Sequence, residues 1–413
     1  MHEFRQDPPT RVDTPVSPVS PGTAVEVFAA FLRLGLTSFG GPVAHLGYFR
    51  AEFVLRRRWL DERAYADLVG LCQFLPGPAS SQAGFAIGLM RAGLSGGLAA
   101  WAGFTLPSAL LLLALATGAG GHSAAPVGAG LLHGLGLVAV AVVAQAVWGM
   151  ARSLCPDRTR ASLATLAAIL VLFAPTAIGQ VAAICLGALA GWWFCRERLE
   201  ASDGQPPPLP SVVRPRTGIA CLALFAALLS MPLLIPTPGA AIALFDAFYR
   251  SGALVFGGGH VVLPLLHDAV VTPGWVSEPV FLSGYGLTQA MPGPLFTFAA
   301  YLGGSMPGRL GGAAGAGIAL VAIFLPGLLL LAGVLPFWHR LQAIAGARAA
   351  MRGANAAVVG LLGAALYNPL WTSTVRHPAD LVVALLAFTL LVAWRIPPLL
   401  VVVLCAGLGA LGG

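Results

Sequence analysis

Eight of the stretches that contain no charged residue are rich in apolar side chains and mark predicted membrane segments. They are residues 92–151, 161–195, 217–245, 279–308, 310–339, 353–375, 381–394 and 396–413. A helix needs about 20 residues to cross ~30 Å of hydrocarbon. The segments long enough to do so are 95–117, 126–151, 218–235 and 310–335, whereas 381–394 is too short on its own. The pattern predicts an all-α integral membrane protein that combines spanning helices with shorter ones.

The composition supports a membrane protein and excludes several other classes. Of the 413 residues, 57% are hydrophobic and only 9% are charged, whereas a soluble domain carries roughly 25% charged residues. This excludes most soluble enzymes and nucleic-acid-binding proteins. The net charge of +7 comes from 23 Arg that flank apolar runs, and Lys is absent. Without Lys, this chain alone cannot form the phosphate-binding loop of an ATPase or the phosphorylated loop of a cation pump.

The second half of the chain repeats the first at an offset of 216 to 222 residues. The pattern F-x-R-x-G-x-x-x-F-G-G begins at Phe31 and again at Phe248, and a Pro-Gly-Pro element follows each copy. Other matched pairs are Trp59 and Trp275, Glu62 and Glu278, Gln73 and Gln289, Leu106-Pro107 and Leu325-Pro326, and Gly187 and Gly409. Matches at so many glycines and prolines indicate two homologous repeats that cover nearly the whole chain.

The arginines indicate that the two repeats have inverted topology. The stretch 56–63 contains four Arg and its counterpart 272–279 contains none. Conversely, the loop 118–126 has no Arg, while the segment after Pro336 contains three. Because cytoplasmic loops collect Arg, the bias changes sides between the repeats. A single unmatched apolar segment between them would produce this inversion, with the N-terminus inside and the C-terminus outside.

These observations divide the chain into five segments. We predict a disordered tail at 1–23, a first transporter repeat at 24–195, a polar cytoplasmic linker at 196–217, an extra transmembrane span at 218–235 and a second transporter repeat at 240–413. The six cysteines lie far apart and lack zinc-ligand spacing, so we interpret them as apolar filler. No metal ion and no other cofactor is expected.

Each repeat contains two interruptions of its apolar helices. They are Phe39-Gly40-Gly41-Pro42 and Pro76-Gly77-Pro78 in the first repeat, and Phe256-Gly257-Gly258-Gly259 and Pro292-Gly293-Pro294 in the second. A helix that begins after such a break presents free N–H groups and a partial positive charge, which bind anions. Inverted repeats with broken or re-entrant helices form the substrate sites of many secondary transporters. The alternative interpretation is that the breaks are ordinary kinks or turns.

Several polar residues beside the breaks are candidates for binding an oxyanion. Arg33 and Arg250 each lie six residues before a Phe-Gly-Gly break, and charge within a membrane is costly and usually functional. The alternative is that each Arg extends to a lipid headgroup or pairs with a carboxylate such as Glu26 or Asp246. The remaining candidates are His45, His260, Gln73 and Gln289, for which core packing or hairpin closure is the alternative role.

A pair of carboxylates also occupies equivalent positions beyond the first break of each repeat. Glu52 and Asp268 are matched at an offset of 216 residues. Both could carry protons. The alternative is that they lie at a solvent-exposed helix end, where Glu52 would lie beside Arg56 to Arg58.

At these residues the sequence resembles the chromate ion transporter family in its long, two-repeat form. The resemblance is carried by Ser38-Phe39-Gly40-Gly41-Pro42 with Ala44-His45, Trp59-Leu60-Asp61-Glu62, Gln73-Phe74-Leu75-Pro76-Gly77-Pro78 and Phe104-Thr105-Leu106-Pro107-Ser108. It implies a multi-pass protein of the bacterial inner membrane that exports chromate, confers chromate resistance and is driven by the proton-motive force. Sulfate is implied as a related substrate or competitor. Gly259 and Val262 depart from the first-repeat pattern, so the two half-sites are not expected to be equivalent.

The resulting hypothesis is a secondary active transporter for a tetrahedral dianion such as chromate. An anion channel and an uptake carrier for sulfate or another oxyanion are the alternatives. A membrane-embedded enzyme is disfavoured because no nucleophile with a base recurs in the apolar segments. The expected partners are the oxyanion and the lipid bilayer, with no nucleic acid, and a homodimer is left open.

Overall fold

A computed structural model describes residues 22–39, 41–119, 126–174, 177–196, 213–234, 239–255, 261–342 and 344–412. Within these ranges the regular structure is helical and contains no strand. Most of the predicted tail and most of the predicted linker lie outside the described residues. Four helical stretches are long and apolar enough to cross a membrane, namely 79–118, 133–154, 312–337 and 345–374. The all-α membrane fold predicted from the sequence is therefore confirmed.

The helices of the two repeats follow each other in the same order, although the second repeat is divided into more helices. The first repeat contains α1 (Ala24–Thr37), α2 (Gly41–Phe49), a π-helical turn (Arg50–Arg56), α3 (Glu62–Phe74), α4 (Ala79–Ala119), α5 (Pro126–Leu154), α6 (Arg158–Phe173) and α7 (Ala177–Phe194). The second contains α10 (Ala240–Ala253), α11 (Val262–Val270), α12 (Glu278–Ala290), α13 (Phe298–Gly304), α14 (Gly312–Val334), α15 (Trp338–Gln342), α16 (Ala345–Ala365), α17 (Thr372–Thr374), α18 (Pro378–Val392) and α19 (Pro398–Gly412). Helix α4 is matched by α13 and α14 together because its backbone leaves helical geometry at Ala92 and Gly93.

The segment between the repeats forms two helices instead of one long helix. Helix α8 spans Pro215–Leu229 and the four-residue α9 spans Met231–Leu234. The 15 residues of α8 extend only about 22 Å at 1.5 Å per residue. Alone, α8 is thus shorter than the span predicted over 218–235.

Short side chains at helix starts explain several of the boundaries. The Thr23 side chain accepts a hydrogen bond from the backbone N–H of Glu26 at the start of α1, and Asp61 does the same for Ala64 at the start of α3. Asp157 caps α6 in this way. The backbone N–H of Arg160, helped by its guanidinium, holds the pKa of the Asp157 carboxyl below its usual value. Such caps stabilise a helix by about 1 kcal/mol each.

Helices of the two repeats pack against each other in a reciprocal pattern. Helix α1 packs on α4, and its counterpart α10 packs on α14. Helix α5 packs against α18 and α19 of the second repeat, while its counterpart α16 packs against α6 and α7 of the first. Glycines bring these pairs close: Gly191 lies on Gly353 between α7 and α16, and Gly134 lies on Gly409 between α5 and α19. Small residues allow such close approach within a membrane.

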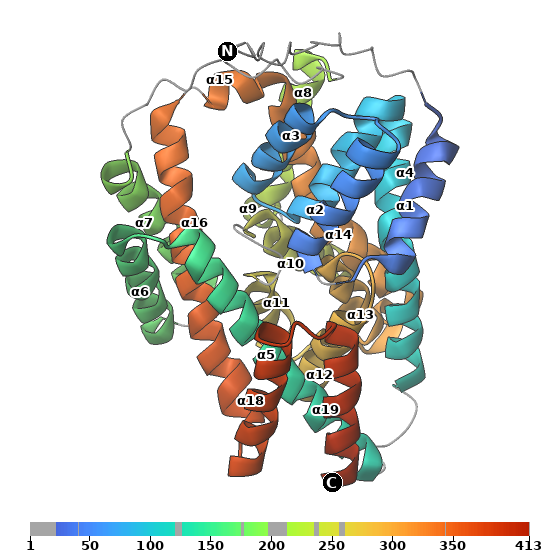
Figure 1. Cartoon of the computed structure of the whole chain (residues 1–413), viewed down its shortest axis with the longest axis vertical. Coiled ribbons are helices and arrows are strands. Elements are labelled where there is room, and N and C mark those ends of the chain that lie inside the picture. Colours follow the sequence, from blue (N-terminus) through green and yellow to red (C-terminus); the bar gives the residue numbers. More distant parts are fainter. Residues whose placement is uncertain are drawn as a thin grey trace, which may run out of the picture.

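Matched helices lie at opposite ends of the molecule (Figure 1). Helix α3 lies at the end that also carries α8 and α15, whereas its counterpart α12 lies toward the other end, near the C-terminal helix α19. This arrangement supports the inverted topology inferred from the arginines, because a parallel repeat would place α3 and α12 at the same end.

Candidate functional site

The Pro-Gly-Pro element of each repeat reaches the first break of the other repeat. The backbone N–H of Gly293 donates to the carbonyl oxygen of Ser38 at 2.9 Å, and the N–H of Gly77 donates to the carbonyl of Val255 at 2.6 Å. Ser38 and Val255 are matched positions, as are Gly77 and Gly293. The two hydrogen bonds are therefore related by the internal symmetry. They bring the Pro-Gly-Pro element of each repeat to the residue that precedes the first break of the other repeat.

Glycine is required at both tips for two physical reasons. The φ angles are +124° at Gly77 and +104° at Gly293, a region that residues with a Cβ rarely adopt. A Cβ on Gly77 would lie 3.0 Å from the Cα of Gly327, and one on Gly293 would lie 2.8 Å from the Ser108 hydroxyl oxygen. Each tip is thus packed directly against the long helix of the opposite repeat.

These hydrogen bonds limit which N–H groups at the tips could bind an anion. The N–H groups of Gly77 and Gly293 already have acceptors within the protein, so they are not free to bind an anion. The available donors at the first tip are the N–H groups of Ala79, Ser80 and Ser81 at the start of α4, because the N–H of Gln82 already donates to the carbonyl of Pro78. An anion at this tip would therefore contact the helix after the break and not the Pro-Gly-Pro turn itself.

A group of buried polar side chains surrounds the first break. Its members are Ser38, His45, Ser80, Ser81, Gln82, Thr105 and Ser108, each no more than 2% exposed. His45 Nδ1 lies 3.4 Å from the Ser80 hydroxyl, and its ring packs edge-on against Phe104. The Nε2 atom of His45 and the hydroxyls of Ser38, Ser81 and Thr105 are buried without a hydrogen-bond partner. Buried polar groups normally have partners, so these atoms could take a ligand.

The same positions are mostly apolar in the second repeat. Ser38, Ser80, Gln82 and Thr105 correspond to Val255, Phe296, Phe298 and Phe324, and His45 corresponds to Val262. Phe296, Phe298 and Phe324 are themselves buried. The polar group thus belongs to one repeat only, in agreement with the expectation that the two half-sites differ.

A small cavity of about 60 Å³ lies where the first break meets the second Pro-Gly-Pro element. It is lined by Gly41, Pro42, Val142, Gln145, Thr288, Gln289, Met291, Gly293, Leu295 and Pro398. The Nε2 atom of Gln289 is buried without a partner, which leaves two N–H donors available. Gln145 donates to the carbonyl of Leu391 at 3.4 Å. The sequence analysis did not select Gln145 or Thr288, because neither is part of a repeated motif.

The remaining candidates lie in different surroundings. Arg33 and Gln73 are exposed, and the Arg250 side chain is 48% exposed and 3.8 Å from the carboxylate of Asp246. Neither arginine lines the cavity at Gly41. Phe39, Pro76, Pro78, Pro292 and Pro294 frame the breaks as expected from the sequence. Gly40, Phe256, Gly257, Gly258 and His260 lie outside the described residues.

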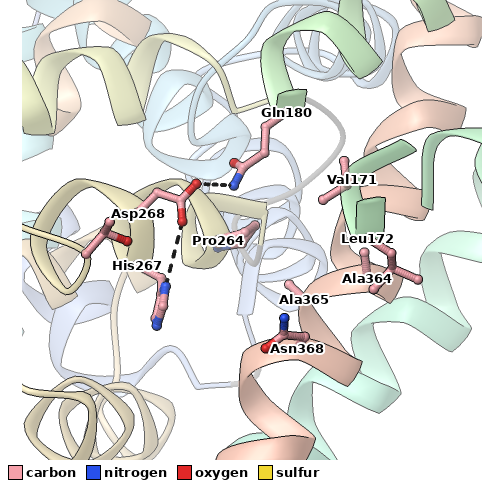
Figure 2. A pocket seen from close by; sticks show the side chains of 10 residues that line it. Val171, Leu172, Gln180, Pro264, His267, Asp268, Ala364, Ala365 and Asn368 are labelled. Atoms are coloured by element: carbon pink, nitrogen blue, oxygen red, sulfur yellow. Dashed lines mark hydrogen bonds and ion pairs between the residues drawn. The ribbon is translucent and has the colours of Figure 1, made fainter. Parts of the chain in front are cut away.

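A second cavity, of about 210 Å³, lies between α11 and the helices α6, α7 and α16 (Figure 2). Its polar lining consists of Gln180, His267, Asp268, Thr272 and Asn368. None of these residues lines the first cavity, so the two are separate sites.

Comparison with known proteins identifies the family. The model of the chromate transporter family matches residues 25–192 and again residues 242–410. The chain belongs to this family. The two matched regions agree with the two repeats found in the sequence, and the chain is a multi-pass membrane protein.

Curated relatives of this chromate transporter cover nearly its whole length. It is 29% identical to the chromate transport protein of Pseudomonas aeruginosa over 93% of this chain and 91% of that protein. It is 27% identical to the chromate transport protein of Cupriavidus metallidurans over 94% and 93% of the two chains. A probable chromate transport protein of Synechococcus elongatus is 28% identical over 75% of each chain. No solved structure matches this chain.

Proposed function

We propose that this protein is a secondary active transporter that exports chromate and is driven by the proton-motive force. The observation that carries the proposal is the pair of reciprocal hydrogen bonds, Gly293 to Ser38 and Gly77 to Val255. They hold the breaks of both repeats at one boundary, and in inverted-repeat carriers the substrate binds at this boundary.

The chemistry of the first break suits a tetrahedral dianion. Hydroxyls, amide N–H groups and a helix start donate hydrogen bonds to oxyanion oxygens without adding a fixed charge. We propose that chromate binds between the start of α4 and the cavity that contains Gly41 and Gln289. The donors of Ser81, Thr105 and Gln289, which lack protein partners, would then bind its oxygens.

The asymmetry between the repeats bears on how the carrier works. Donors concentrated in the first repeat would hold the anion there, whereas the matched positions in the second repeat are the buried residues Phe296, Phe298 and Phe324, whose side chains cannot donate. We propose that the second repeat changes its orientation while the anion stays bound to the first. Sulfate has the same shape and charge and should compete for the same donors.

The proposal is tested by transport in inside-out membrane vesicles that contain the protein. Export corresponds to uptake of labelled chromate into such vesicles, and we expect it to saturate, to increase when the vesicle lumen is acidified and to fall when sulfate is added. A carrier also exchanges external labelled chromate for internal unlabelled chromate. Flux that does not saturate and shows no such exchange would indicate an anion channel. Absence of any chromate flux would contradict the proposed substrate.

A further inference from the structure

The second cavity contains the imidazole of His267 beside the carboxylate of Asp268 (Figure 2), and the carboxylate of Glu278 lies at the other ring nitrogen. His267 Nε2 lies 2.7 Å from an oxygen of Glu278, and His267 Nδ1 lies 3.8 Å from an oxygen of Asp268. The other oxygen of Asp268 accepts a hydrogen bond from Gln180 on α7 at 2.6 Å. A doubly protonated imidazole can donate to both carboxylates, whereas a neutral one has a single N–H.

The first repeat provides an internal comparison for this cluster. Its matched carboxylates, Glu52 and Glu62, pair with arginines: Glu52 lies 2.8 Å from Arg56 and 2.6 Å from Arg57, and Glu62 pairs with Arg50. The residue matched to His267 is Ala51. Arginine stays protonated at every physiological pH. The two repeats thus share a carboxylate pair, neutralised permanently in the first repeat and by a titratable imidazole in the second.

Among the described residues around the cluster, His267 is the basic partner of both carboxylates. Helices α6 and α16 contribute apolar side chains, Asn368 follows α16, and α7 contributes Gln180. From α12, Phe281 packs edge-on against the His267 ring, and on α10 Asp246 and Arg250 pair with each other. Among the described residues, no arginine lies within ion-pair distance of Asp268 or Glu278. Whether the negative charge of these carboxylates is neutralised therefore depends on the protonation of His267.

We propose that His267, Asp268 and Glu278 form the binding site for the proton that is coupled to anion transport. This proposal rests on the proposed function and names the residues that bind the coupled proton. Histidine is the side chain whose ordinary charge change falls between about pH 5 and 8. With the proton bound, His267 holds both carboxylates together. When the proton leaves, at least one carboxylate loses its partner, which changes the charge beside the contact from Asp268 on α11 to Gln180 on α7.

The position of α11 explains how proton binding reaches the substrate. Helix α11 begins at Val262, directly after the second Phe-Gly-Gly break. Its cavity wall is completed by α6 and α7 of the first repeat. A change in the attraction between α11 and α7 therefore alters the fit between the repeats, which is the boundary where the breaks meet. Linkage then requires that chromate binding changes proton affinity by the same factor.

The experiment uses purified full-length protein in liposomes and compares His267→Arg with the wild type. Arginine reproduces the permanent pairing of the first repeat, so we expect exchange of labelled for unlabelled chromate to persist. Accumulation driven by a pH gradient should fall on the order of tenfold, the size of a typical coupling. The proton uptake or release that accompanies chromate binding, measured in weakly buffered solution, should also disappear. His133→Gln is the matched control, because His133 forms a similar 2.8 Å pair with Asp380 elsewhere.

Each result assigns the failure to one of the two proposals. If His267→Arg exchanges chromate, and also accumulates it along a pH gradient, as well as the wild type does, that result would overturn the proton site and leave the chromate function intact. Absence of exchange in the wild type would instead overturn the chromate function. If His267→Arg does not fold, Glu278→Gln replaces it, since the amide keeps the shape and removes the charge that holds the proton. Wild-type coupling in Glu278→Gln would likewise overturn the proton site.

Discussion

The backbone N–H of Gly293 lies 2.9 Å from the carbonyl oxygen of Ser38, although 254 residues separate them in the sequence. The symmetric bond from Gly77 to Val255 makes the same connection in the opposite direction. Each Pro-Gly-Pro element is therefore hydrogen-bonded to the residue that precedes the first break of the other repeat. The chromate site that we propose at this boundary would therefore draw on both repeats.

Replacing the tip glycines should separate the repeats at this point. We expect Gly77→Ala and Gly293→Ala to abolish chromate transport, because the added Cβ would press on Gly327 or Ser108 at φ angles that alanine rarely adopts. Gly274→Ala is the matched control, since Gly274 also has a positive φ of +77° but open space around it. Equal loss in all three variants, measured as labelled flux per folded protein, would show that backbone strain alone explains the effect.

Gln289 and Gln73 occupy matched positions in different surroundings, so the effects of replacing each one can be compared directly. We expect Gln289→Leu to weaken chromate binding on the order of 10-fold or more, because a hydrogen bond to a charged group contributes about 1.5 to 3 kcal/mol. Gln73→Leu should have a smaller effect because Gln73 is exposed. Equilibrium binding of labelled chromate to purified protein measures both. A larger loss in Gln73→Leu would place the anion at the other tip.

Thr105→Val separates a binding role from a structural one. The Thr105 hydroxyl is buried without a partner, so removing it should leave stability unchanged or slightly increased. If the hydroxyl donates to the anion, chromate affinity should fall by roughly 5- to 10-fold, in line with about 1 kcal/mol per neutral hydrogen bond. Thermal unfolding and chromate binding are measured on the same preparation. Unchanged affinity would remove Thr105 from the proposed site.

The arginines before the breaks are expected to act by charge and not by direct contact. Arg33 is exposed and does not line the cavity at Gly41. Arg33→Gln should therefore weaken chromate transport by about 3-fold or less, and Arg33→Lys should restore it, because only the positive potential matters at a distance. Transport is compared at low and high salt, where screening should remove the difference. Full loss in Arg33→Lys would instead indicate that the guanidinium fork binds the anion directly.

Inverted topology predicts which loops face each side of the membrane. In a variant without native cysteines, a Cys at Ser277 should react with an impermeant reagent added from the periplasm, and a Cys at Ser211 should not. Ser277 precedes α12, which lies toward the end opposite α8 and α15 (Figure 1). Equal protection of both sites would contradict the inverted arrangement. The reagent's reaction with both sites in disrupted membranes shows that each Cys is accessible once the barrier is removed.

The amino-acid sequence by itself determined the membrane class, the repeats and the breaks. Apolar runs without charge can be stable only in a bilayer, and glycines and prolines at matched positions show where each helix must stop. These are local properties, so they are readable along the chain. The helix bounds confirm the breaks at Gly41, where α2 begins, at Ala79, where α4 begins, and at Ala290, where α12 ends before Pro292.

The tertiary structure alone decided which of these pieces meet. Nothing in the local sequence indicates that Gly293 binds Ser38, that Gln289 lines a cavity while Gln73 is exposed, or that Gln180 reaches Asp268. The matched motifs look alike in sequence because both repeats need the same backbone turns. The surroundings of a side chain, in contrast, depend on the helix that packs against it. Those partners come from the other repeat, more than 80 residues away in each case, and contacts at such separation leave no periodic signal in the chain.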